Sequence, residues 1–369
     1  MKNYILFFLI GTISVNAQIN PQDYGVKFDG SGESTNAAFF QVAIDSANAT
    51  GQDIHLPYGS VVLNSGLNIP SGVKFKGSGI HSTMIQWNWD YTGTGMEGTN
   101  LDLEGFTIKR DSIIGGTAIK CNGGNFKANS IQIWNHHNIA IELNGCDTVS
   151  IKRSRLLGSL NDSHGHSTEA LVKFTGVTNH VEILDSHLKT TNSGVLIQGN
   201  CQDFLYKNTS CTNMDYGIRF NPASLSQNIV IENADISGCN ISSVFLKKVK
   251  NVLVKNVYGV VRNYDGTNDI GTFHVEGSNT ENVLFEKVIV NNNNESAASS
   301  GIQINEGANI KINYFSSANA TYPVTVKSAA NNVIIKGAIR RKMNNEVLYN
   351  IQDSTKVKIV EFTHFPSIN

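Results

Sequence analysis

The sequence lacks an excess of charge of either sign, which narrows the partners that the protein can have. Its 29 Lys and Arg residues balance 30 Asp and Glu residues, so the formal net charge is −1 over 369 residues. Nucleic-acid binding depends largely on basic residues that neutralise phosphates, and electrostatic binding to membranes depends on a basic cluster. We therefore expect neither a nucleic acid nor a membrane as a partner.

Long hydrophobic runs are also scarce. The apolar stretch at residues 4–15 is too short to span a bilayer, and no later run is long enough. Lys2 precedes this stretch and the small-residue sequence Val15-Asn16-Ala17 follows it, as in a cleavable signal peptide. Residue 18 is Gln18 rather than cysteine, which argues against a lipoprotein anchor. We predict a signal peptide at residues 1–17 and a secreted or periplasmic protein.

Cysteine and linker sequences are few. The five cysteines are odd in number and have no C-x-x-C spacing, so we expect small buried hydrophobic residues rather than disulfides or a zinc site. They are Cys121, Cys146, Cys201, Cys211 and Cys239. No Pro-, Ser- or Gly-rich linker divides the chain, and we expect one elongated domain.

What the sequence does contain is an internal repeat. The segment Asn228–Asn233 returns as Asn251–Asn256, a spacing of roughly 23 residues that is typical of solenoids. About ten such repeats follow one another from Leu101 onward. Each has two short runs of alternating apolar residues, a turn residue between them, and a third run, and alternation with a period of two indicates strands. Three strands per repeat predict the coils of an all-β, right-handed parallel β-helix.

One turn of each repeat carries a column of Asn and Asp residues. These residues tolerate the left-handed backbone conformation that a sharp bend needs, and glycine adopts it without a clash. The predicted ladder consists of Asn129, Asp185, Asn208, Asn233, Asn256 and Asn313, with Gly105 and Gly337 in the same position.

The N-terminal region has a different pattern. Asp23–Gly30 precedes a helix-like segment at residues 33–44, for which Ser34 or Thr35 is a candidate N-cap, and two further motifs follow at residues 54–60 and 69–79. On the helix we expect Ala38, Val42 and Ala43 to share one face.

This order of motifs resembles the pectate-lyase-like superfamily, in which a short glycine-containing segment leads to a capping helix, an LPxGxY strand and an L-x-G-x-G strand. Ser60 stands where that pattern has an aromatic residue. The resemblance implies a β-helix with an N-terminal cap at residues 18–60 and coils over residues 61–369. The superfamily contains lyases, hydrolases, epimerases and tailspikes, so the resemblance indicates the fold more closely than the activity.

The third strand of each repeat offers a column of outward residues. Reading the register across coils gives Lys120, Glu142, Lys173, Leu196, Arg219, Phe245, His274, Gln303 and Thr325, with Lys247 in a second column. The resemblance implies that an extended glycan lies along this sheet, and cations suit an acidic glycan. Alternating charge on neighbouring strands is also how a solvated surface avoids repulsion.

Three insertions enter this sheet, at residues 157–169, 261–269 and 291–300. Extra length in a solenoid goes into loops on one face, often the binding face. We expect the loops to wall a cleft that contains His164 and His166 as acid or base candidates and Asp269 as a substrate-binding candidate. With Asp269 we group Glu142, Asn192, Phe245, Lys247 and His274 as candidate substrate-binding residues.

Two reactions fit these residues. Glu169 and Asp215 lie two coils apart, about 9.6 Å, near the carboxylate separation of inverting glycosidases, although Asp215 also suits a turn. A lyase instead needs cations that neutralise a uronate carboxylate and a base that removes a proton, roles open to Lys173 and Arg219. We slightly favour the lyase.

The third alternative is a non-catalytic glycan-binding or surface protein. The Asp-Asp, Gly-His-Gly and Arg-Ile-Lys motifs of polygalacturonases are missing, as is a recognisable calcium constellation of pectate lyases. No metal site is assigned, and calcium stays a candidate cofactor. The substrate, the linkage and the oligomeric state are not determined by the sequence.

Overall fold

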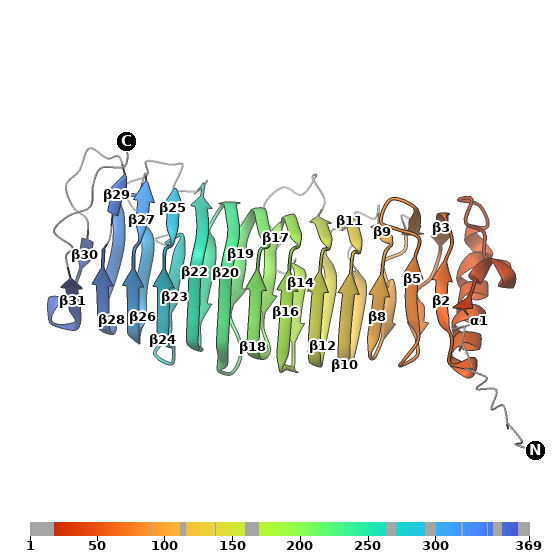
Figure 1. Cartoon of the computed structure of the whole chain (residues 1–369), viewed down its shortest axis with the longest axis horizontal. Coiled ribbons are helices and arrows are strands. Elements are labelled where there is room, and N and C mark those ends of the chain that lie inside the picture. Colours follow the sequence, from red (N-terminus) through yellow and green to blue (C-terminus); the bar gives the residue numbers. More distant parts are fainter. Residues whose placement is uncertain are drawn as a thin grey trace, which may run out of the picture.

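The computed structural model describes residues 18–88, 90–110, 116–136, 138–158, 170–262, 271–291, 300–318, 320–337, 339–341 and 349–360. These residues form a rod of stacked coils with helix α1 (Glu33–Thr50) at its N-terminal end (Figure 1). All strand pairs in the described part are parallel, and about eleven turns follow one another. The predicted right-handed parallel β-helix is confirmed.

Each coil has three faces. The first face contains β2 (Asp53–Leu56), β5 (Lys74–Gly77), β8 (Leu101–Glu104), β16 (His180–Leu184), β18 (Asn200–Lys207), β24 (Glu281–Glu286) and β31 (Val357–Val360). The second contains β3 (Gly59–Leu63), β6 (Thr83–Trp87), β9 (Thr107–Arg110), β11 (Gln132–His136), β13 (Arg155–Gly158), β25 (Ile289–Asn291), β27 (Ser316–Ala318) and β29 (Ile339–Arg341). The third contains β4 (Leu67–Ile69), β7 (Met96–Gly98), β14 (Ala170–Thr175), β21 (Ser242–Lys247), β23 (Phe273–Glu276) and β30 (Tyr349–Ile351).

Longer strands bend from one face to the next. β10 (Thr117–Asn129), β12 (Ile139–Lys152), β26 (Ser300–Asn313) and β28 (Tyr322–Lys336) join the third face to the first. β20 (Ser226–Cys239) and β22 (Val249–Val261) join the first to the second, and β17 (His187–Ile197) and β19 (Ser210–Phe220) join the second to the third. The short strands β1 (Gln18–Ile19) and β15 (Val177–Thr178) complete the set, with 3₁₀ helices at Pro21–Tyr24 and Ser354–Lys356.

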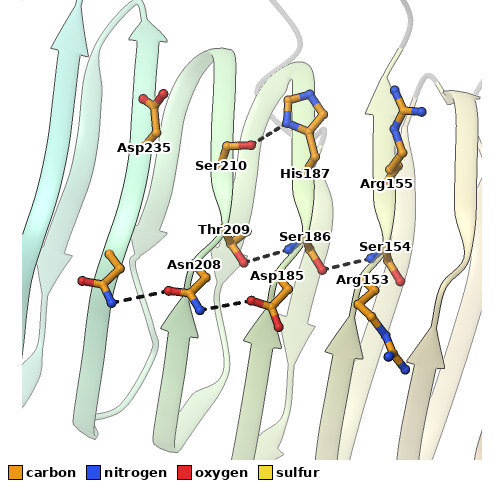
Figure 2. Close-up of a pocket in the computed structure, with 11 residues that line it drawn as sticks. Arg153, Ser154, Arg155, Asp185, Ser186, His187, Asn208, Thr209, Ser210 and Asp235 are labelled. Carbon is orange, nitrogen blue, oxygen red and sulfur yellow. Dashed lines mark hydrogen bonds between the residues drawn. The ribbon is translucent and has the colours of Figure 1, made fainter.

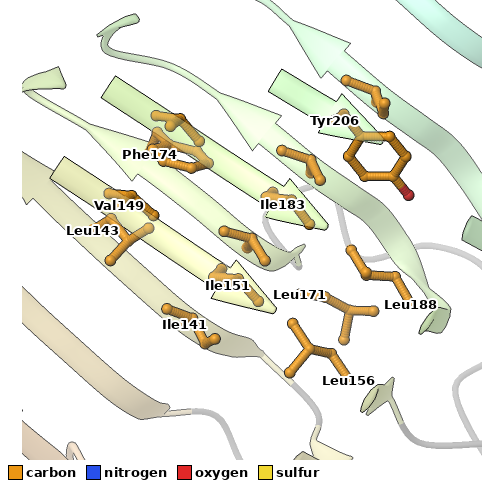
Figure 3. Packing of buried hydrophobic residues seen from close by; sticks show 14 of the residues in the cluster. Ile141, Leu143, Val149, Ile151, Leu156, Leu171, Phe174, Ile183, Leu188 and Tyr206 are labelled. Carbon is orange, nitrogen blue, oxygen red and sulfur yellow. The ribbon is translucent and has the colours of Figure 1, made fainter. Parts of the chain in front are cut away.

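The core runs along the axis of the rod. Alternate strand residues point inward and stack on the equivalent residues of the next coil, as do the Cα partners Ile151 and Ile183 in Figure 3. Phenylalanine rings continue this stacking, with centroids 6.4 Å apart for Phe174 and Phe204. All five cysteines are buried and unpaired, as predicted. Because the buried residues contact the coils on either side, the stacking of coils supplies the hydrophobic stabilisation.

Helix α1 (Glu33–Thr50) covers the open N-terminal end, where unpaired strands and core would otherwise meet water. Its N-cap is Gly32, so the predicted N-cap at Ser34 or Thr35 is wrong. Ala43 is buried as expected, but Ala38 and Val42 are exposed. Phe40 forms the buried face instead, between the rings of Phe28 at 6.3 Å and Phe75 at 6.1 Å. The expected face is therefore wrong, because the face that packs on the first coils contains Phe40 and Ala43 and leaves Ala38 and Val42 exposed.

The turn between the first and second faces keeps a left-handed conformation through ten coils. Positive φ angles occur at Gly105, Ser130, Arg153, Asp185, Asn208, Asn233, Asn256, Lys287, Tyr314 and Gly337. Asn129 and Asn313 are therefore assigned one residue too early, since Ser130 and Tyr314 hold the bend in their coils. The amide of Asn256 donates to Asn233 at 3.0 Å, and Asn208 donates to Asp185 at 3.1 Å.

A second ladder, not predicted as such, lies near the start of the first-face segments of the strands. Its members have positive φ angles, and each amide donates to the residue one coil earlier. They are Asp203, Asn228, Asn251, Asn282, Asn309 and Asn332, with distances from 2.7 to 3.2 Å. Two bends per coil are thus fixed by side chains that bond to the neighbouring coil, which holds the register.

None of the helices in the described ranges is long and apolar enough to cross a membrane.

Candidate functional site

The third face has the register that the sequence predicts. Successive Cα partners run Lys120, Glu142, Lys173, Leu196, Arg219, Phe245, His274, Gln303 and Thr325. Lys247 pairs with Glu276 in the second column. Because the register matches, these side chains form one continuous line along the rod.

Exposure differs along this line. Lys120, Glu142, Lys173 and Arg219 are half-buried, but the exposed fraction falls to 7% at Phe245 and 1% at His274. The prediction of an exposed column is therefore wrong at Leu196, which is 3% exposed, and from Phe245 onward. Phe245 and His274 still lie outside the hydrophobic core cluster. They are buried against their neighbours on the outside of the sheet, and their rings lie 5.0 Å apart.

A polar cluster, the His274 cluster, continues from this point. Glu276 joins its members, since Oε1 lies 2.8 Å from Lys247 Nζ and Oε2 lies 3.5 Å from His274 Nε2. Asn305 Nδ2 lies 3.1 Å from the same imidazole nitrogen, and Gln303 Nε2 donates to Asn305 Oδ1 at 3.0 Å. Lys247 and His274, predicted as separate substrate contacts, are thus brought into one network. The Lys247 ammonium is neutralised there by Glu276.

Arg219 lies on aromatic rings. Its guanidinium carbon is 4.4 Å from the centroid of Tyr216 and 5.9 Å from that of Phe245, the geometry of cation–π contacts. Within the described residues its Nε is buried without a hydrogen-bond partner. Burial raises the pKa of Tyr216, Asp215 and Glu276 add to this effect, and the charge of Arg219 opposes it. The Tyr216 phenol therefore stays protonated at neutral pH.

The sequence pattern does not single out Tyr216 as a candidate site residue. The segment at residues 213–217 has the composition of a turn, yet β19 continues through it, so Tyr216 projects beside Arg219. A signal was present, because an aromatic residue three positions before an arginine in a bent strand can fold back onto it. Recognising that signal requires knowing that the strand does not end at Asn213.

Asp215 is held by amides from the coils on both sides. Asn192 Nδ2 donates to Oδ2 at 3.0 Å and Asn240 Nδ2 donates to Oδ1 at 2.8 Å. Asn192 also accepts a hydrogen bond from Ser193 Oγ at 3.0 Å. Asn192, a candidate substrate-binding residue, thus bonds to the Asp215 carboxylate. Both oxygens of Asp215 are occupied by a ladder of the same kind as those at the bends.

Four predicted site residues, His164, His166, Glu169 and Asp269, lie outside the described residues. The Glu169–Asp215 pair and the acid or base roles of His164 and His166 therefore stay predictions. Glu142 and Lys173 are Cα partners on adjacent strands, as expected. Among the residues whose positions are described, no group of three or more His, Cys, Asp or Glu side chains is placed to hold a metal ion.

A polar pocket of about 550 Å³ lies at the bend between the first and second faces (Figure 2). His187 Nδ1 and Ser210 Oγ are 2.5 Å apart above it, and the hydroxyls of Ser186 and Thr209 accept hydrogen bonds from backbone N–H groups of neighbouring coils. Burial lowers the pKa of His187, and the positive charges of Arg155 and Lys189 lower it further. The hydroxyls that line this pocket are used to hold coils together.

The described residues define a parallel β-helix protein with one continuous line of side chains along its third face. The family model for rhamnogalacturonase A and epimerase, pectate-lyase-like, matches residues 18–257. The chain belongs to this family, which confirms the resemblance seen in the N-terminal motifs.

Solved structures agree in fold. The A-module of a mannuronan C-5 epimerase from Azotobacter vinelandii is 14% identical with a TM-score of 0.60, covering 92% of this chain and 99% of that one. The family 28 exopolygalacturonase of Yersinia enterocolitica is 10% identical with a TM-score of 0.62, covering 95% and 79%. The Dettilon tailspike protein is 11% identical with a TM-score of 0.63, covering 92% and 70%. No curated protein sequence is similar enough to count as a match.

Proposed function

We propose that the protein is an exported enzyme that cleaves an acidic polysaccharide along the third face by β-elimination. The observation that carries this proposal is the position of Arg219, half-buried on two aromatic rings. Within the described residues Arg219 forms no ion pair with a carboxylate. A guanidinium that is partly desolvated and not neutralised attracts a carboxylate more strongly than one in water.

The chemistry follows from that charge. In β-elimination a base removes the proton next to the uronate carboxylate, the electron pair forms a carbon–carbon double bond, and the glycosidic oxygen leaves with the other half of the chain. Arg219 would hold the carboxylate and stabilise the negative charge that develops on it. The protonated phenol of Tyr216, beside the same guanidinium, is suited to donate a proton to the leaving oxygen. Lys173, two strands away, stays our candidate for the base.

The hydrolase alternative has less support. It requires Asp215 to act on the substrate, and both oxygens of that carboxylate are occupied by Asn192 and Asn240. The non-catalytic alternative is favoured by the His274 cluster, where Lys247 is neutralised and His274 is almost fully buried. Under this alternative, Arg219 and Lys173 bind the glycan but take no part in a reaction.

The test uses purified mature protein with polygalacturonate, alginate and a neutral glucan, following reducing ends and ultraviolet absorbance together. A lyase produces both signals, and a hydrolase produces reducing ends alone. We expect Arg219→Ala to lower turnover about a hundredfold or more, and Arg219→Lys to restore only part of it because lysine lacks the planar fork.

Arg155→Ala is the matched control, since Arg155 is an exposed arginine on the second face. Turnover that survives Arg219→Ala unchanged, or falls equally in the Arg155 control, contradicts the assignment. Binding of polygalacturonate without any product favours the non-catalytic alternative.

A further inference from the structure

We propose that the second face carries a separate glycan-binding site, the Trp134 pocket, for a neutral sugar residue. The pocket has a volume of about 310 Å³ and spans the first coils next to the cap. Its position along the rod follows the Cα partners Ser60, Met84, Thr107 and Gln132, which lie on four successive strands. Three strand spacings make it about 14 Å long. The pocket shares no residue with the third face.

Two exposed aromatic side chains belong to this pocket. Trp134 is 42% exposed and Tyr58 is 78% exposed, whereas the large side chains that fill the core have almost no exposure. Trp134 lies two residues after Gln132 on β11, so both side chains point outward on the same side of the sheet. An exposed indole presents a flat apolar surface with a polar N–H at one edge. The apolar face of a pyranose ring has matching chemistry, with hydroxyl groups at its edge.

The floor of the pocket contains an amide without a partner. Gln132 is 93% buried, given its exposed fraction of 7%, and within the described residues its Oε1 accepts no hydrogen bond. A buried amide oxygen of this kind costs folding free energy, and such groups are rare in native proteins. Thr107 beside it donates to the carbonyl of Ile80. Gln132 is thus the floor residue with unused hydrogen-bonding capacity, suited to a sugar hydroxyl after a small rotation of its side chain.

The charge of the lining selects the class of sugar. Among the lining residues that the structure describes there is no Lys, Arg, Asp or Glu, and the polar groups are hydroxyls, the Gln132 amide and the imidazole of His81. A uronate carboxylate would find no cation among these lining residues, and Lys109, the Cα partner of Trp134 on β9, already makes an interaction of its own. The lining therefore fits a neutral pyranose, either in a mixed polysaccharide or in a neutral glucan.

The cap makes this corner of the pocket rigid. Gly59 lies against Phe28, and a Cβ built on it would lie 2.0 Å from the Phe28 carbonyl oxygen, so only glycine fits. This close approach allows Ser60 N–H to donate to Phe28 O at 2.9 Å. Tyr58 and Ser60 are thereby positioned by the chain segment before α1. The aromatic residue expected at position 60 is absent, and Tyr58 lines the pocket two residues earlier.

The experiment is native electrophoresis in gels containing barley β-glucan, galactomannan or xyloglucan, with a polygalacturonate gel alongside. Wild-type protein should be retarded in at least one neutral gel, and Trp134→Ala should reduce that retardation about tenfold. Tyr258→Ala is the matched control, since Tyr258 is an aromatic residue 36% exposed on the same face but far from the cap. It should behave as wild type.

Gln132→Leu separates binding from folding. If the amide serves a ligand, this variant should weaken retardation about tenfold while its melting temperature stays equal to or above that of wild type. A lower melting temperature with unchanged retardation would show that Gln132 is structural and overturn its assignment. No retardation in any neutral gel, or equal loss in Trp134→Ala and Tyr258→Ala, would overturn the site. Retardation only by polygalacturonate would overturn the neutral class.

The site is independent of the proposed reaction. Arg219→Ala should keep full retardation in the neutral gels even when turnover is lost. If the protein proves to cleave nothing, the Trp134 pocket still predicts neutral-glycan binding, and if retardation fails, the turnover assay is unaffected.

Discussion

Replacing Asp215 by asparagine separates the two roles that this carboxylate can have. The substitution keeps the shape and turns one acceptor oxygen into an N–H donor, which then faces the amide of Asn192 or Asn240. Neither neighbour can rotate by 180° freely, because Asn192 Oδ1 accepts from Ser193 Oγ and Asn240 makes a further interaction of its own. One hydrogen bond to a charged group is therefore lost.

The expected cost follows from that loss. Hydrogen bonds to charged groups contribute about 1.5–3 kcal/mol, and because Asp215 is half-exposed we expect about 1–2 kcal/mol less stability. Denaturant unfolding monitored by circular dichroism would measure the difference as a lower midpoint with an unchanged slope. In the same samples turnover should stay within about threefold of wild type, since the proposed lyase does not use Asp215.

The opposite result would refute this reasoning. A catalytic general acid or base contributes about 10²–10⁴ in rate. If Asp215→Asn lowered turnover by about that factor with an unchanged unfolding midpoint, the carboxylate would act on the substrate, and a hydrolase pairing with Glu169 would become the better interpretation.

Three further predictions concern stability and reactivity. Asn256→Ala should cost about 1–2 kcal/mol in denaturant unfolding, because φ is 51° at this position and the bond to Asn233 is lost, whereas Asn256→Gly should cost less. The pKa of His187 is lowered from 6.5 in the folded state, mainly by burial, so the unfolded state binds more protons as the pH falls below about 6.5. His187→Gln should therefore lose less stability than wild type between about pH 7 and pH 5; an identical loss would contradict this. Burial raises the pKa of Cys201 to about 12, and a thiol reagent should label it only after unfolding.

The register of the coils could be predicted from the sequence because it depends on local chemistry. Asn208, Asn233 and Asn256 recur at nearly constant spacing, and the alternation of apolar residues then fixes which side chains face the core. The assignment failed where another residue type takes the left-handed position, as at Ser130 and Tyr314. There the stacking of neighbouring coils imposes the bend on residues that do not favour it.

Burial on the third face could not be predicted in the same way. Alternation places Phe245 and His274 outside the core, and it says nothing of what packs over them. Their burial depends on contacts between coils, such as the ring contact at 5.0 Å and the Asn305 amide. Likewise the hydrogen bonds of Asp215 involve Asn192 and Asn240, which lie 23 residues before it and 25 residues after it in the sequence. Such contacts follow from the register only once the path of each bend is known.

The long insertions between the second and third faces leave the stacking of the coils undisturbed. Glu142 and Lys173 remain Cα partners although the chain between them contains residues 159–169, and Lys173 in turn pairs with Leu196. Gln227 and Lys250 are likewise partners one full coil apart. A whole coil could therefore be removed or duplicated without altering either end, which would change the length of the rod by about 4.8 Å per step. The number of sugar residues that the proposed third-face site spans can thus change separately from the residues proposed to bind each one.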